Sequence, residues 1–143
     1  MTLKTYEGAC HCGAIGWHLH TSIAPADWVL RACQCSFCRA HDTRCVSDSN
    51  GRVDFRHSQR ERLNLYQFGL RTAHFVVCRH CGVYLGAVLN HAKGRFTTVN
   101  VNVLCDPIGA LPEPQLMQYD TEDESARIDR RTRVWTPVGT WFS

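Results

Sequence analysis

Cysteine is the residue type with the most chemical potential in this chain, which holds nine of them in 143 residues. Seven form three close groups and two stand alone: Cys10 and Cys12; Cys33, Cys35 and Cys38; Cys78 and Cys81; then Cys45 and Cys105. The first residues lack the apolar core of a signal peptide, so we expect a cytoplasmic protein whose thiols stay reduced. Closely spaced thiols in that setting favour metal sites over disulfides.

The first and third groups have the form of two half-sites. Cys10 and Cys12 are two residues apart, so an extended backbone directs both thiols to one side. Cys78 and Cys81 form a C-x-x-C turn, and a glycine follows directly after each pair. Together they offer the four sulfurs of a closed tetrahedral zinc site with a structural role. The alternatives are ordinary buried cysteines or a redox C-x-x-C.

The middle group, C-x-C-x-x-C, can supply three ligands from one short segment. Three protein ligands with a vacant fourth position are typical of a zinc ion that is open to a substrate. The spacing of Cys33, Cys35 and Cys38 is equally compatible with a second closed, structural site. A fourth side chain would then complete it: Cys45, Cys105 or a histidine such as His41.

Strand patterns dominate the segments that must position these thiols. Residues 15–19 alternate apolar and polar side chains, as a half-buried strand does. Further apolar or β-branched runs predict strands at 63–68, 72–77, 83–89 and 96–104. One stretch favours a helix, residues 121–131, in which acidic residues come first and basic residues last. The sequence therefore predicts a mainly β fold with the cysteine groups at strand ends and turns.

Composition indicates one folded domain, because 44% of the residues are hydrophobic and 20% are charged. Three prolines and a glycine fall within 107–114, which divides a core at 1–106 from a carboxy-terminal appendage at 107–143 packed on the same domain. The net charge of +3 is scattered, which does not favour a nucleic-acid partner. No apolar stretch approaches the roughly 20 residues of a membrane helix.

Four segments together resemble the glutathione-dependent formaldehyde-activating enzyme and centromere protein V family. In chain order they are GACHCG at 8–13, CQCSFCR at 33–39, FVVCRHCG at 75–82 and VNVNVLCD at 99–106. The resemblance implies a zinc-binding β-tent fold of small antiparallel sheets with short helical segments. It also implies two Zn²⁺ per chain. One would be structural, on Cys10, Cys12, Cys78 and Cys81, and the other would lie at the active site, on Cys33, Cys35 and Cys38.

The activity implied by this resemblance is that of a carbon–sulfur lyase, which adds glutathione to formaldehyde and gives S-hydroxymethylglutathione. A zinc ion held by three thiolates is a mild Lewis acid, better suited to a soft thiolate than to generating hydroxide. A small thiol such as glutathione is therefore the expected partner. Its carboxylates would pair with arginine, and three arginines lie near the motifs: Arg31, Arg39 and Arg71.

His41 and His74 are the candidates for proton transfer, because histidine titrates near neutral pH. The alternative for each is a solvated surface position. Two other functions stay open: a family enzyme acting on another aldehyde adduct or imine, and a non-enzymatic zinc module. The module would bind its protein or nucleic acid through exposed aromatic residues, for which the candidates are Trp17, Trp28, Phe37 and Tyr84. Their strand-like positions favour core burial instead.

Overall fold

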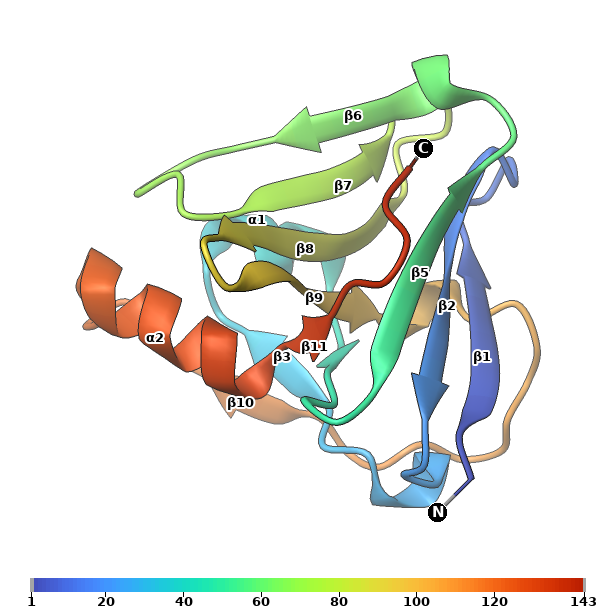
Figure 1. Cartoon of the computed structure of the whole chain (residues 1–143), viewed down its shortest axis with the longest axis horizontal. Helices are drawn as coiled ribbons and strands as arrows, with labels where there is room; N and C mark the ends of the chain where they lie inside the picture. The colour runs from blue at the N-terminus through green and yellow to red at the C-terminus, as the bar shows by residue number, and fades with distance from the viewer. Residues whose placement is uncertain (1, 143) are drawn as a thin grey trace.

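A computed structural model describes residues 2–142 and shows a mainly β protein. One of its two sheets is small and antiparallel, in the order β1 (Lys4–Ala9), β2 (Ile15–Thr21) and β5 (Arg52–His57) (Figure 1). Gly8 lies opposite Trp17 in this sheet, and a Cβ at Gly8 would approach the Trp17 ring to 2.4 Å. The glycine that precedes the first cysteine pair is therefore needed for packing.

The second sheet contains the remaining eight strands. Its order is β10 (Gln115–Met117), β3 (Arg31–Cys33), β4 (Cys45–Val46), β9 (Gly94–Asn100), β8 (Tyr84–His91), β7 (His74–Cys78) and β6 (Leu63–Tyr66), and β11 (Thr136–Pro137) also pairs with β9. Neighbouring strands are antiparallel, except that β10 runs parallel to β3. This pairing places Cys33, the first cysteine of the middle group, beside Met117 of the carboxy-terminal strand β10.

The main core lies between the two sheets. Both sheets contribute side chains to it: Ile15, Trp17, Leu19, Val53 and Phe55 from the small sheet, and Val76, Leu85, Val88 and Val99 from the large one. The buried indole of Trp17 donates a hydrogen bond from Nε1 to the carbonyl oxygen of Leu85, at 3.1 Å. That bond joins the two sheets and satisfies the one polar group of the largest core residue.

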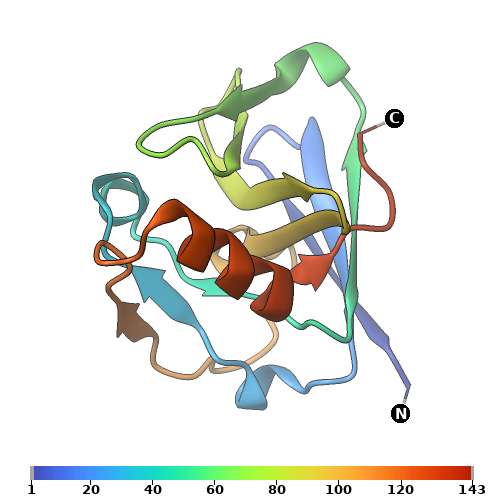
Figure 2. The same cartoon turned by 60° about the vertical axis from the view of Figure 1, so that its left-hand side comes forward.

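The large sheet is also covered on its other face, by two helices. These are α1 (Ser36–His41) and α2 (Glu124–Val134), and Figure 2 shows α2 lying across the strands β8 and β9. A second apolar cluster lies beneath them, in which Ile128 and Trp135 pack with Phe75 and Ala87. Because both faces of β8 are covered, six of its eight residues are buried, which explains its nearly continuous apolar run.

The predicted strand at 96–104 is correct only in its first half. The strand ends at Asn100, and the 3₁₀ turn η3 (Val101–Val103) follows. The side-chain oxygen of Asn100 accepts a hydrogen bond from the backbone N–H of Asn102 at 3.2 Å, which offers the backbone a local alternative to the sheet ladder. Two further 3₁₀ turns occur elsewhere, η1 (Pro25–Asp27) and η2 (Arg60–Arg62).

The predicted helix at 121–131 is present but shifted by three residues. Asp123 caps its start, because its Oδ1 accepts the backbone N–H of Ala126 at 2.8 Å, and the helix ends at Val134. The short helix α1 has no counterpart among the sequence-based predictions, since six residues are too few to show a helical period.

Residues 107–142 pack against the rest of the chain through three kinds of contact. The strands β10 and β11 extend the large sheet, α2 covers one face, and Phe142 lies in the core between the sheets. Among the residues that the structure describes, none of the helices has the length and apolarity needed to cross a membrane.

Candidate metal centres and the adjoining cavity

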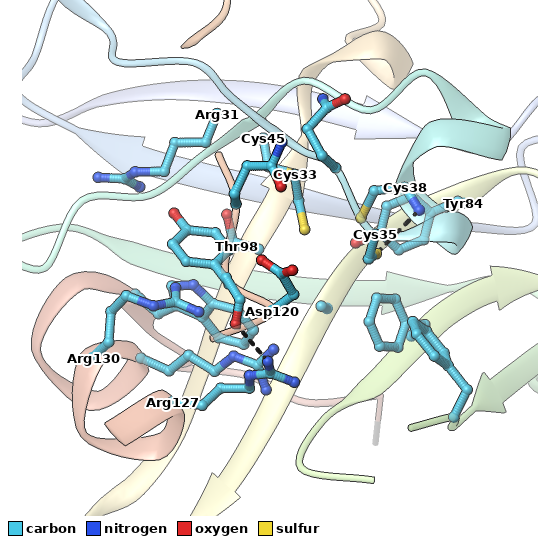
Figure 3. A pocket seen from close by; sticks show the side chains of 18 residues that line it. Arg31, Cys33, Cys35, Cys38, Cys45, Tyr84, Thr98, Asp120, Arg127 and Arg130 are labelled. Atoms are coloured by element: carbon cyan, nitrogen blue, oxygen red, sulfur yellow. Dashed lines mark hydrogen bonds between the residues drawn. The ribbon is translucent and has the colours of Figure 1, made fainter. Parts of the chain in front are cut away.

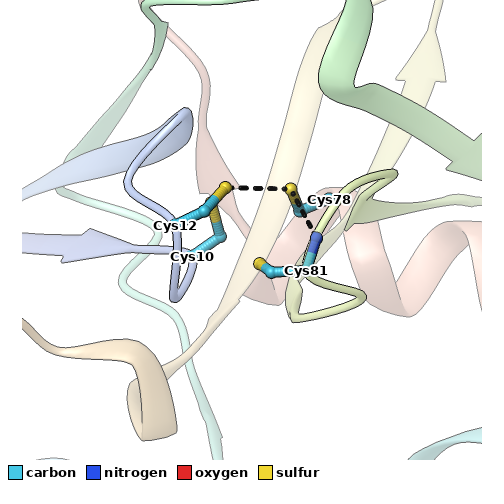
Figure 4. A group of neighbouring side chains, drawn as sticks. All are labelled: Cys10, Cys12, Cys78 and Cys81. Carbon is cyan, nitrogen blue, oxygen red and sulfur yellow. Dashed lines mark hydrogen bonds between the residues drawn. The ribbon is translucent and has the colours of Figure 1, made fainter.

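Two turns from distant parts of the sequence bring the first and third cysteine groups together. The turn between β1 and β2 carries Cys10 and Cys12, whereas Cys78 ends β7 and Cys81 lies in the turn that leads to β8 (Figure 4). Each turn closes with a glycine of positive φ, +81° in the first and +77° in the second. That conformation is strained for other residue types, so the glycine after each pair is required by the turn.

The four sulfurs lie close enough together to share one metal ion. The Sγ atoms of Cys10 and Cys12 are 3.6 Å apart, those of Cys12 and Cys78 are also 3.6 Å apart, and all four lie within 4.8 Å of one another. Zinc–sulfur bonds of about 2.3 Å in a tetrahedron place the sulfurs about 3.8 Å apart. The predicted four-cysteine group therefore exists and can hold a metal ion.

Backbone amides point at these sulfurs and favour their thiolate form. The N–H of Ile15 approaches the sulfur of Cys10 at 3.5 Å, and that of Cys81 approaches the sulfur of Cys78 at 3.4 Å. The pKa of Cys12 is lowered to about 6, first by the backbone amide of Ala14 and then by neighbouring sulfurs and Arg62. Metal ions bind the thiolate, so this environment suits a ligand set.

The middle group is assembled by a strand end and a helix start. Cys33 is the last residue of β3, Cys35 is the N-cap of α1, and Cys38 lies within α1. The backbone N–H of Cys38 donates to the sulfur of Cys35 at 3.4 Å. The three sulfurs lie within 4.8 Å of one another, so this group can also hold a metal ion.

Contacts among the three thiols of this group shift their pKa values in opposite directions. Hydrogen bonds from Cys33, and then from Cys38, lower the pKa of Cys35 strongly. The same contacts raise the pKa of Cys33 and Cys38, because these two thiols keep their protons to donate them. A concentrated thiolate of this kind is the donor that zinc and other thiophilic cations select.

A cavity of about 360 Å³ opens beside the middle group (Figure 3). Its polar wall contains all three cysteines, Gln34, Gln118, Tyr119, Asp120 and four arginines, and its apolar wall contains Phe68, Phe75, Ala87 and Trp135. None of the four cysteines of the first metal centre lines this cavity. The three-cysteine group is therefore the one with access to a small molecule, in a cavity whose size is typical of ligand sites.

Phe37, inside the C-x-C-x-x-C run, fastens α1 to the sheet. Its ring centroid lies 4.7 Å from that of Phe75 and 5.0 Å from that of Tyr84. Rings in such contact add specific packing energy to their burial. The aromatic residue between the second and third cysteine thus holds the ligand segment in place.

The two histidines predicted to transfer protons lie outside the cavity lining. The ring of His41 packs on Phe37, with centroids 4.5 Å apart, and His74 is the first residue of β7. Of the three arginines near the motifs, Arg31 lines the cavity, whereas Arg39 and Arg71 do not. The groups in the lining that can move a proton are instead the carboxyl group of Asp120 and the hydroxyls of Tyr84 and Tyr119.

The asparagines of the VNVNVL run position the loop that follows α1. Asn102 donates from Nδ2 to the carbonyl oxygen of Asp42 at 2.8 Å, and its Oδ1 accepts from Nε of Arg44 at 2.7 Å. Asn100 donates to the carbonyl oxygen of Tyr84 at 3.0 Å. These bonds tie the loop after α1 to η3 and join β9 to β8, which gives the run a physical role beside the site.

The two unassigned cysteines have different surroundings. Cys45 is buried and lines the cavity, and burial raises its pKa to about 12. Cys105 is exposed, and its sulfur lies 3.6 Å from Oε1 of Glu7. Cys105 therefore lies apart from both metal-binding groups.

Comparison with known proteins identifies one relative of known structure. A crystal structure of a Rhodobacter sphaeroides protein, a structural-genomics target, shares 34% sequence identity with this chain at a TM-score of 0.53. The match covers 78% of this chain and 99% of the other. The chain belongs to the same family as this Rhodobacter protein. No protein-family model matches the chain, and no curated protein does.

The family relationship supports the fold and assigns no activity, because no function is stated for the Rhodobacter protein.

The site residues that sequence reasoning missed come from the carboxy-terminal part of the chain. Arg127, Arg130 and Arg131 project from α2 into the cavity lining, beside Tyr119 and Trp135. The one signal for them was the helical spacing of the arginines within the predicted helix.

Proposed function

We propose that this protein is a zinc-dependent enzyme of the carbon–sulfur lyase type that joins a small thiol to formaldehyde or a related electrophile. The observation that carries the proposal is the different setting of the two cysteine groups. The four-cysteine group joins two turns of the chain and does not line the cavity, whereas Cys33, Cys35 and Cys38 do line it. A three-ligand centre beside a cavity has the form of a catalytic zinc site.

The resemblance to the glutathione-dependent formaldehyde-activating family supports the same conclusion. Zinc held by three thiolates supplies a soft, weakly acidic cation that accommodates a substrate thiolate. Cys33, Cys35 and Cys38 would hold that ion, and hydrogen bonds from the other two thiols lower the pKa of Cys35. The apolar side chains of Phe68, Phe75 and Trp135 would reduce the access of water to the reacting atoms.

The reaction adds a thiol across a carbonyl. A carbon–sulfur bond forms, the carbon–oxygen double bond becomes single, and the proton of the thiol passes to the oxygen. Asp120 can carry that proton, since its carboxyl group points into the cavity between the cysteines and the arginines of α2 (Figure 3). The participation of His41 or His74 stays a prediction of the sequence. Burial holds the pKa of Tyr84 well above its usual value, so its hydroxyl remains a proton donor.

The non-enzymatic zinc module has less support. It needs exposed aromatic residues, and three of the four candidates, Trp17, Trp28 and Tyr84, are buried. The fourth, Phe37, is half-buried among other rings. Trp17 and Trp28 belong to the core and Tyr84 to the cavity lining, so these three rings offer no stacking surface for a nucleic acid.

The proposal is tested with zinc-loaded protein, glutathione and formaldehyde, with adduct formation followed by exchange NMR. The parent protein is expected to form the adduct faster than the uncatalysed reaction. Cys35→Ser is expected to lose that acceleration and one of two zinc ions, whereas Cys105→Ser keeps both. A Cys35→Ser variant as active as the parent would refute the proposed site, and so would a parent with no acceleration on any thiol–aldehyde pair.

A further inference from the structure

Opposite the cysteines, the cavity is lined by positively charged arginines from α2. Arg127, Arg130 and Arg131 follow the helical spacing that places side chains on one face, and all three line the cavity. Figure 3 shows Arg127 and Arg130 on one side of it, with Cys35 and Cys38 on the other. A ligand in the cavity can therefore contact the sulfurs and the guanidinium groups at the same time.

Two of these arginines have an acidic partner, although the buried Nε of Arg127 has no hydrogen-bond partner among the described residues. Arg130 makes a two-point contact with the carboxylate of Glu122, at 2.7 and 2.9 Å, and its guanidinium lies 3.6 Å from the centroid of Tyr119. Arg127 lies 3.5 Å from the same carboxylate and donates to the carbonyl oxygen of Tyr119 at 2.8 Å. One carboxylate thus serves both cations.

Arg131 is left without a counter-ion in the part of the chain that the structure describes. Its guanidinium donates from Nη1 to the hydroxyl of Thr72 at 2.7 Å and lies 4.8 Å from the Trp135 ring. Its buried Nε has no hydrogen-bond partner there. Burial, with added repulsion from Arg130 and Arg127, lowers the pKa of Arg131 to about 10. A partly buried cation with an unused donor and no counter-ion is stabilised when an anion comes to it.

The charges around the cavity also favour an anion. Four arginines line it, including Arg31, whose Nη1 donates to the hydroxyl of Ser47 at 2.8 Å and which has no ion pair among the described residues. The acidic groups are fewer, namely Asp120 in the lining and Glu122 behind it. The wall opposite the cysteines is therefore positively charged.

We propose that the cavity selects a thiol that carries a carboxylate, and that Arg131 receives this carboxylate while the sulfur reaches Cys33, Cys35 and Cys38. The binding of the ligand's sulfur rests on the proposed function, whereas the binding of its carboxylate rests on Arg131 alone. The planar guanidinium can offer paired donors to a carboxylate, a geometry that a lysine cannot supply. The carboxy-terminal part of the chain would thereby determine which thiols are accepted.

The test compares two thiols of equal shape on the zinc-loaded protein by isothermal titration calorimetry. The probes are 3-mercaptopropionate and its neutral amide, 3-mercaptopropionamide. The parent protein is expected to bind the acid about 10- to 100-fold more tightly, the range of a hydrogen bond to a charged group. Arg131→Gln should remove this preference and leave the affinity for the amide unchanged.

Arg133→Gln is the matched control, because Arg133 lies on the same helix, is exposed and pairs with Asp129 outside the cavity. It should keep the full preference for the acid. If Arg131→Gln does not fold, Arg131→Lys replaces it, and the preference should fall because the charge remains without the paired donors. Equal affinity of the parent for both probes would overturn the inference. A preference that survives either Arg131 substitution unchanged would do the same.

Glutarate, which has two carboxylates and no sulfur, separates this inference from the proposed function. If neither thiol binds but glutarate binds the parent more tightly than Arg131→Gln, the thiol chemistry is wrong and the anion site is supported. If the thiols bind without discrimination between acid and amide, the thiol site stands and the role of Arg131 is refuted.

Discussion

Replacing Cys81 by serine tests the structural role of the four-cysteine centre. A metal ion there joins Cys12 to Cys78 across 66 residues of chain, because these two sulfurs lie 3.6 Å apart. Closing a loop of that length lowers the entropy of the unfolded chain by an amount worth about 4 kcal/mol. A serine hydroxyl is a poor zinc ligand, so Cys81→Ser should lose most of this stabilisation along with the ion.

A loss of about 4 kcal/mol is a large part of the total stability of an ordinary domain. For a chain of this size it corresponds to a fall in Tm of about 8 to 16 °C. The measurement is thermal unfolding followed by circular dichroism, with zinc content determined on the same samples. The removal of zinc from the parent protein by a chelator should produce a similar fall.

Two other variants serve as controls. Cys105→Ser removes an exposed thiol outside both groups and should unfold like the parent. Cys35→Ser affects a centre whose ligands span only six residues, so the closed loop is short and the fall in Tm should be smaller. If Cys81→Ser unfolds at the same temperature as Cys105→Ser, the four sulfurs do not clamp the fold.

Three further outcomes are expected. Elemental analysis should find two zinc ions per parent chain and one in Cys35→Ser; one or none in the parent would contradict the two-site assignment. Glu122 has a pKa below its ordinary value of 4.5, mainly through hydrogen bonds from Arg130, so it stabilises the fold above pH 4.5 and loses this effect as the pH falls through the lowered pKa. Glu122→Gln should therefore be less stable than the parent near neutral pH, and urea unfolding should show the difference shrinking in acid; a constant difference would oppose this reasoning. Asn100→Ala should cost about 1–3 kcal/mol of unfolding free energy, because the carbonyl oxygen of Tyr84 loses a buried donor.

The cysteine groups could be predicted because ligand spacing is a local property. A pair two residues apart, or separated by two residues and followed by glycine, has few geometries, and the structure places Cys10, Cys12, Cys78 and Cys81 within 4.8 Å. Most strands were predictable for a similar reason, since alternation and β-branched runs act over neighbouring residues. The strand at 96–104 was predicted too long because one side-chain hydrogen bond, from Asn102 to Asn100, ends it.

The cavity, in contrast, depends on contacts that no local pattern contains. The helix α2 was predicted near its true position, but its register and the surface beneath it follow from packing of Ile128 and Trp135 on β7 and β8. That packing is what brings Arg131 to the cavity that the middle cysteines line. The parallel pairing of β10 with β3 is equally non-local and depends on the whole large sheet.

The amino-acid sequence by itself thus determined which residues can bind metal and that the fold is mainly β, because both follow from side-chain chemistry and short-range geometry. Cysteine spacing left open whether the middle group is closed or accessible, the family resemblance implied an active site there, and the tertiary structure places Cys33, Cys35 and Cys38 in the lining of a cavity. The tertiary structure also decided that arginines about 90 residues further along the chain face the three sulfurs of Cys33, Cys35 and Cys38. Such contacts between distant segments are determined by the burial of apolar surface across the whole chain, which no short segment encodes.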